Sequence, residues 1–97
     1  MIAHFADEAT EDLFHGVSSK KAQKIPQVLW AVARRKLDML NAAYELSDLR
    51  VPPGNMLEKL TGKKWSGFYS IRINNQYRIV FNWAEHSAHE VQIVDYH

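Results

Sequence analysis

Two arginines in a predicted β-hairpin and two residues at the end of the chain have side chains that can act on a phosphodiester. These are Arg72, Arg78, Tyr96 and His97, the last two within the terminal run Asp95-Tyr96-His97. Guanidinium groups bind phosphate oxygens in a bidentate manner, and a histidine exchanges protons near neutral pH. A tyrosine stacks on a base or holds a hydroxyl by hydrogen bonds. Together they indicate phosphodiester cleavage, in which His97 moves protons while the arginines stabilise the charged transition state.

The hairpin that carries the two arginines has a register that its apolar residues fix. In each of its strands, apolar side chains alternate with other residues. Matching the two apolar faces places Ile73 opposite Tyr77 and leaves residues 74–76 as a three-residue loop. Arg72 then lies opposite Arg78, on the face of the hairpin that does not enter the core.

Two interpretations of this arginine pair remain open. Arginines directly opposite each other in neighbouring strands repel one another. Either both are solvated or paired with an acid such as Asp95, or an anion normally lies between them. The end of the chain is open to two interpretations as well. Either His97 transfers protons, or it belongs to a frayed chain end, as terminal residues often do, and has no catalytic role.

The elements that position these residues are predicted from apolar spacing and from turn signals. The first half predicts a short strand at 2–5, a helix between the N-cap Asp7 and Gly16, and a longer helix at 26–45. The second half predicts an antiparallel meander with strands at 68–73, 77–83 and 90–94, turns at 74–76 and 85–88, and a further candidate strand at 56–60. The fold class is therefore α+β, with the helices covering one face of the sheet.

The composition limits the class of protein. The 97 residues are expected to form one domain, 1–97, and their 46% hydrophobic content excludes a disordered chain. There is no cysteine, and the five histidines lack metal-ligand spacing, so we expect no metal and no cofactor. No membrane span or signal peptide is visible, which predicts a cytoplasmic protein without a membrane partner. The net charge of +1 gives little bulk attraction for nucleic acid, so phosphate contacts must come from local patches.

Several segments resemble a known family of bacterial toxins. The loop and hairpin are similar to the β-sheet core of HigB toxins in the RelE/ParE superfamily, at 60–62 (LTG), 70–74 (SIRIN) and 76–79 (QYRI). The terminal 94–97 (VDYH) resembles the HigB ending, and 48–55 (DLRVPPGN) is similar to the GraT-like proteobacterial branch. The resemblance covers essentially the whole chain.

This resemblance implies a fold in which two N-terminal helices pack on a curved antiparallel sheet, as in small microbial ribonucleases. It implies the toxin of a type II toxin–antitoxin pair, namely a ribosome-dependent endoribonuclease that cuts mRNA without a metal and inhibits translation. The implied partners are the ribosome, its mRNA and a HigA-type helix-turn-helix antitoxin. Operator DNA would be reached only through that antitoxin.

The resemblance also implies roles for individual residues. Arg72 and Arg78 would hold the scissile phosphate, Tyr96 would orient the base or the attacking 2′-hydroxyl, and His97 would be the general acid or base. Asp95 would position its neighbours.

The lysines near the glycine loop are expected to contact RNA rather than to catalyse. Several family members carry a catalytic lysine where this chain has Thr61. We therefore assign RNA contact, and no step of the reaction, to the nearby Lys59, Lys63 and Lys64. Two other functions stay open, namely a ParE-like inhibitor of DNA gyrase and a catalytically degenerate toxin that acts only as an antitoxin-binding co-repressor.

Overall fold

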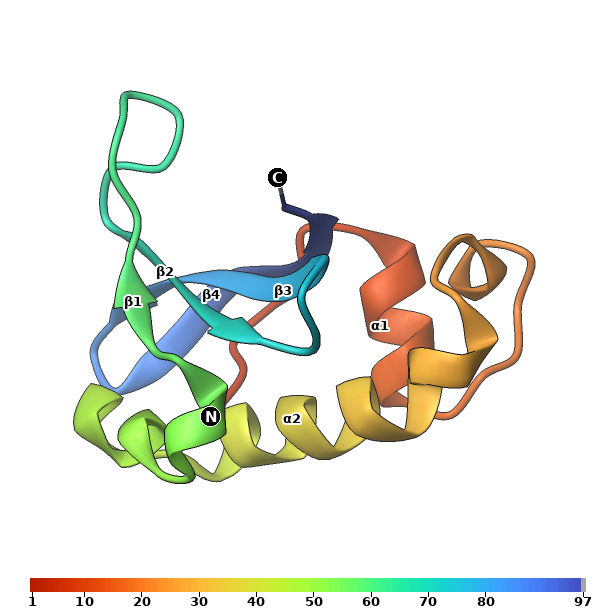
Figure 1. Ribbon diagram of the computed structural model, residues 1–97, viewed down its shortest axis with the longest axis horizontal. Coiled ribbons are helices and arrows are strands. Elements are labelled where there is room, and N and C mark those ends of the chain that lie inside the picture. The colour runs from red at the N-terminus through yellow and green to blue at the C-terminus, as the bar shows by residue number, and fades with distance from the viewer. Residues whose placement is uncertain (97) are drawn as a thin grey trace.

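Within residues 1–96, two α-helices and a four-stranded antiparallel sheet make up the fold (Figure 1). The computed structural model describes residues 1–96. The helices are α1 and α2, and the strands follow in the sheet order β1-β2-β3-β4. Their bounds are α1 Glu8–Phe14, α2 Trp30–Ala42, β1 Glu58–Lys59, β2 Phe68–Arg72, β3 Tyr77–Ala84 and β4 Ser87–Asp95. The α+β class is confirmed, but only α1 lies near the N-terminus, since α2 belongs to the middle of the chain.

The first helix has the ends that the sequence predicts. The Oδ1 atom of Asp7 accepts a hydrogen bond from the backbone N–H of Thr10 at 2.8 Å, which satisfies one of the free donors of the first turn. Gly16 follows the helix with a φ of +75°, a conformation that glycine adopts without strain.

The second helix is shorter at both ends than the predicted 26–45. It is preceded by a 3₁₀ turn at Gln27–Leu29 and ends at Ala42. At the C-terminal end, the carboxylate of Asp48 accepts hydrogen bonds from the N–H groups of Tyr44 and Glu45 at 3.1 and 3.0 Å. These bonds start the 3₁₀ turn η3 (Leu46–Arg50) and draw the backbone out of the helix. Tyr44 therefore lies beyond the end of α2 and is 65% exposed.

The sheet has the predicted register in its central hairpin. Arg72 pairs with Arg78 across β2 and β3, and residues 74–76 form the loop. The next turn differs from the prediction, because Glu85 and His86 both adopt positive φ and close a two-residue turn, so that β4 begins at Ser87. The predicted strand at 2–5 is reduced to two isolated parallel bridges with β4.

The core lies on one face of the sheet, between β2–β4 and the two helices. Figure 1 places α2 beneath the sheet and α1 beside the end of the sheet, next to α2, whereas the loop between β1 and β2 rises on the side away from α2. Buried side chains from both layers form one cluster, which includes Leu13, Leu37, Leu40, Ile71, Ile79, Phe81 and Val91. The opposite face carries Ser70, Arg72 and Arg78, as alternation along the strands requires. Within residues 1–96 no helix is long and apolar enough to span a membrane.

Candidate active site

The two arginines of the hairpin line a pocket of about 440 Å³ on the face of the sheet away from the core. One wall is the hairpin itself, and the other is the segment that runs from η3 into β1. The full lining is Arg50, Pro53, Met56, Leu57, Glu58, Arg72 and Arg78. Three guanidinium groups and one carboxylate therefore face a single pocket, which leaves an excess of positive charge there.

Arg78 is held by three neighbours. Its Nη1 atom forms an ion pair with the carboxylate of Glu58 and donates a hydrogen bond to Ser70 Oγ at 3.2 Å. Its Cζ atom lies 4.6 Å from the centroid of the Tyr96 ring, a cation–π contact. Only 13% of the Arg78 side chain is exposed, so these contacts fix its orientation. The acid beside Arg78 is thus Glu58, which lies next to it because β1 pairs Glu58 with Ser70.

Arg72 has a different environment. Its Nε atom is buried and has no hydrogen-bond partner within residues 1–96. A buried charged donor without an acceptor costs free energy, and in native proteins such groups normally have a partner, an ordered water or an ion. Arg72 therefore offers an unused donor beside Arg78, which is the arrangement that a phosphate or another anion would satisfy.

The end of the chain is fixed against the hairpin loop by Gln76. The backbone N–H of Tyr96 donates to the carbonyl of Gln76 at 2.7 Å, and Gln76 Nε2 donates to Asp95 Oδ2 at 2.9 Å. Tyr96 is half-buried over Arg78, whereas Asp95 is exposed and pairs with Tyr77 at the end of the sheet. The predicted catalytic His97 lies outside the described residues.

The three predicted RNA-contacting lysines do not line the arginine pocket. Lys59 pairs with Tyr69 in β1, and this alternation directs its side chain to the face opposite Glu58. Lys63 and Lys64 are exposed in the loop between β1 and β2, which stands away from the helices (Figure 1). Lys64 Nζ lies 5.1 Å from the ring centroid of Trp65 in the same loop.

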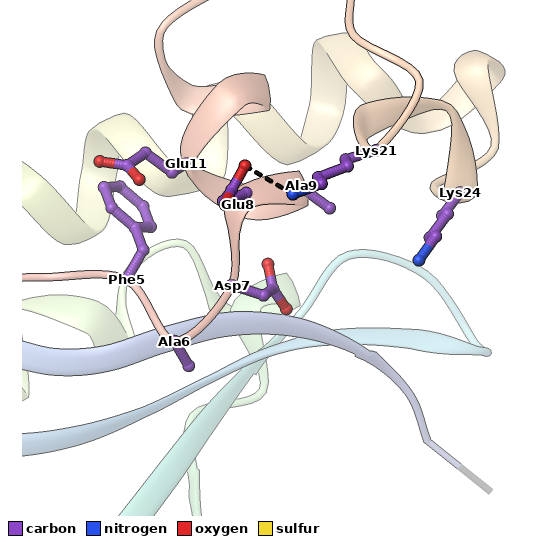
Figure 2. Close-up of a pocket in the computed structure, with 8 residues that line it drawn as sticks. All are labelled: Phe5, Ala6, Asp7, Glu8, Ala9, Glu11, Lys21 and Lys24. Atoms are coloured by element: carbon purple, nitrogen blue, oxygen red, sulfur yellow. Dashed lines mark hydrogen bonds and ion pairs between the residues drawn. The ribbon is translucent and has the colours of Figure 1, made fainter.

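A separate cavity of about 480 Å³ lies at the start of α1 (Figure 2). Its charged side chains come from Asp7, Glu8 and Glu11 on one side and from Lys21 and Lys24 on the other. Lys21 Nζ and Glu8 Oε2 form an ion pair at 2.7 Å, and this hydrogen bond raises the pKa of Lys21. Because acids and bases here neutralise one another, this cavity lacks the excess positive charge of the arginine pocket.

Two charged residues of the pocket, Arg50 and Glu58, were not assigned a role from the sequence. Glu58 belongs to a two-residue strand, and nothing in its local pattern indicates that it pairs with an arginine 20 positions later. Arg50 lies within a segment that the resemblance covers, yet only the folded chain brings it to the pocket of Arg72 and Arg78.

Comparison with known proteins identifies the family of the chain. The model of a family described as the RelE-like toxin of type II toxin–antitoxin system HigB matches residues 3–97. The chain is 40% identical over 85 residues to Toxin HigB-1 of Vibrio cholerae serotype O1, an alignment that covers 88% of this chain and 86% of the relative. It is 41% identical over 70 residues to an uncharacterized protein of Haemophilus influenzae, covering 72% of this chain and 68% of that protein. The chain belongs to the HigB-like family of RelE-like toxins from type II toxin–antitoxin systems.

Proposed function

We propose that this toxin is a ribosome-dependent endoribonuclease that cuts mRNA and thereby inhibits translation. The observation that carries the proposal is the buried, unpartnered Nε of Arg72 beside Arg78. Two neighbouring guanidinium groups that line one pocket are suited to bind the non-bridging oxygens of a phosphodiester in a bidentate manner. A protein that only blocks another protein needs no such group.

In the proposed reaction, a hydroxyl of the RNA is the nucleophile. The 2′-hydroxyl of a nucleotide attacks the adjacent phosphorus, its oxygen forms a new P–O bond, and its proton passes to a general base. The bond from phosphorus to the 5′-oxygen of the next nucleotide then breaks, and that oxygen receives a proton from a general acid. Arg72 and Arg78 stabilise the extra negative charge on the phosphate oxygens in the transition state.

The C-terminal residues supply orientation and proton transfer. Tyr96, whose ring lies on Arg78, orients the base or the attacking hydroxyl. His97 serves as the general acid or base, since an imidazole changes its charge near neutral pH. Asp95, which Gln76 holds in place, positions these neighbours.

Glu58 gives Arg78 an anionic partner in the free protein. An incoming phosphate competes with this carboxylate for the same guanidinium group. When RNA binds, a phosphate therefore replaces the Glu58 carboxylate as the partner of Arg78. This replacement lowers the affinity of the toxin for a phosphate that has no other contact with the protein.

Dependence on the ribosome follows from weak intrinsic attraction for RNA. The net charge is only +1, and Glu58 neutralises part of the pocket. The ribosome presents an mRNA strand at a fixed position, and such positioning removes several kcal/mol from a barrier. No metal ion is needed, because the guanidinium groups supply the positive charge that a metal supplies in other nucleases.

The proposed partner is a HigA-type antitoxin with a helix-turn-helix domain. A type II toxin pairs with a protein antitoxin, and this toxin has a net charge of only +1 with which to attract operator DNA. The toxin therefore reaches operator DNA only through the antitoxin. We place its action in the cytoplasm, where the ribosomes are.

The proposal is tested by inducing the toxin in cells and sequencing newly formed mRNA 5′ ends while plasmid supercoiling is followed. We expect new 5′ ends within translated codons and unchanged supercoiling, and Arg72→Ala should abolish the new ends. Altered supercoiling without new mRNA ends would instead identify a gyrase inhibitor. Neither change, together with stable binding of the antitoxin, would identify a toxin that acts only in repression.

A further inference from the structure

A second cavity adjoins the arginine pocket at the edge of the sheet. This second cavity, of about 510 Å³, is lined by Glu45, Lys59 and Tyr69 among others, and it shares Arg50, Leu57 and Glu58 with the arginine pocket. The shared residues lie on and beside β1, the two-residue edge strand. The two cavities therefore adjoin at β1, and we refer to the pair as the groove.

Arg50 stands where the two cavities meet. It is exposed, and its guanidinium group forms no hydrogen bond or ion pair within residues 1–96. Its neighbours in the arginine pocket are Arg72 and Arg78, so an anion bound there lies in the field of a third positive charge.

A buried polar network holds the backbone on both sides of Arg50. Asn55, whose side chain is fully buried, donates from Nδ2 to the carbonyls of Leu49 and Val51 at 3.1 and 3.4 Å. Its Oδ1 atom accepts a hydrogen bond from Lys36 Nζ on α2.

This network accounts for the burial of a lysine in α2. Lys36 is only 9% exposed, and burial lowers its pKa, with the nearby charge of Arg35 acting in the same direction. Burying an ammonium group without an acid beside it is costly, and the hydrogen bond to Asn55 offsets part of that cost. The result is a 3₁₀ turn that presents Arg50 to the groove from a fixed backbone position.

We propose that Arg50 binds the phosphate next to the scissile one and guides the RNA strand over β1 into the second cavity. There Lys59 contributes a further positive charge, although it lies on the other face of the sheet from Arg72 and Arg78. Arg50 is thus a substrate-binding residue outside the reacting phosphate, and the inference rests on the proposed action on RNA.

The test is binding of a short single-stranded RNA, 2′-O-methylated so that it cannot be cleaved, to the purified toxin over a range of salt concentrations. We expect Arg50→Ala to weaken binding about tenfold at low salt, as the loss of one charge-assisted phosphate contact does. The slope of log K against log salt should fall in magnitude by about 0.7. Arg50→Lys should keep the slope, because it keeps the charge.

Lys20→Ala is the matched control, since it removes one exposed positive charge far from β1 in the chain. It should leave both affinity and slope as in the wild type. The inference is wrong if Arg50→Ala and Lys20→Ala have the same slope, or if the wild-type toxin does not bind the oligonucleotide. The toxin could also bind the oligonucleotide through Arg50 and yet cut no mRNA on ribosomes. That result would contradict the proposed function but would support the assignment of Arg50 to RNA binding.

Discussion

Replacement of either hairpin arginine by methionine should abolish cleavage, but the two changes should move stability in opposite directions. Arg72 carries a buried Nε without a partner within residues 1–96. An unsatisfied buried donor costs about 1–3 kcal/mol. Arg72 is only half-buried as a residue, so we expect Arg72→Met to recover the lower part of this range and to raise the free energy of unfolding by about 1 kcal/mol.

Arg78→Met should instead destabilise the fold. It removes the ion pair with Glu58 and leaves Ser70 Oγ, on a fully buried residue, without its donor. Glu58 is half exposed and can be hydrated, so the cost comes mainly from Ser70 and amounts to about 1 kcal/mol. In a domain of this size, a change of 1 kcal/mol shifts Tm by roughly 4–8 °C.

Thermal unfolding of the two variants and the wild type, followed by circular dichroism, measures these shifts. Arg35→Met, at an exposed position on α2, is the control and should stay within about 0.5 kcal/mol of the wild type. Added inorganic phosphate should raise the Tm of the wild type and not that of Arg72→Met, because binding to the folded state alone stabilises it. The reasoning is refuted if Arg72→Met lowers Tm as much as Arg78→Met does.

Three further predictions concern groups around the site. Lys36→Met should leave Asn55 Oδ1 without its donor and so lower the free energy of unfolding at neutral pH by about 1–3 kcal/mol. Urea titration measures this change, with Lys24→Met, at an exposed position, as control. Burial lowers the pKa of Lys36 below 10.5, so between that lowered pKa and 10.5 the unfolded chain binds more protons than the folded protein. The free energy of unfolding of the wild type should therefore rise with pH in this range. The methionine variant should lack this rise. Tyr96→Phe should keep the ring on Arg78 and leave Tm unchanged, while Tyr96→Ala should lose activity and part of the stability. Equal activity of the wild type and both variants would exclude a role for the tyrosine. Deletion of His97 should reduce the cleavage rate by ~10²–10⁴-fold while antitoxin co-purification persists, and unchanged growth arrest would remove His97 from the mechanism.

The central hairpin was predictable because residues close together in the sequence determine its register. Two strands with apolar alternation and a short polar loop admit one register that keeps both apolar faces together. That register alone places Arg72 opposite Arg78, and the structure confirms it. The N-terminal helix was predictable for a similar reason, since Asp7 and Gly16 mark its ends with local hydrogen bonding and backbone geometry.

The features that depend on contacts between different segments of the chain were not predicted from the sequence. Apolar spacing extends the second helix to residue 45, but the carboxylate of Asp48 captures two backbone N–H groups and ends it earlier. The candidate strand at 56–60 reduces to two residues, yet its pairing sets Glu58 beside Arg78. A lysine on a helix reads as a solvated residue, and only the folded chain shows that Lys36 is buried against Asn55.

Cleavage of a defined mRNA by the purified toxin, with and without ribosomes stalled on it, tests the central claim most directly. The account predicts cuts within the codon exposed on the ribosome, no appreciable cutting of the same mRNA when it is naked, and no cutting by Arg72→Ala in either case. Rapid cutting of naked mRNA, or wild-type cutting by Arg72→Ala on the ribosome, would contradict it.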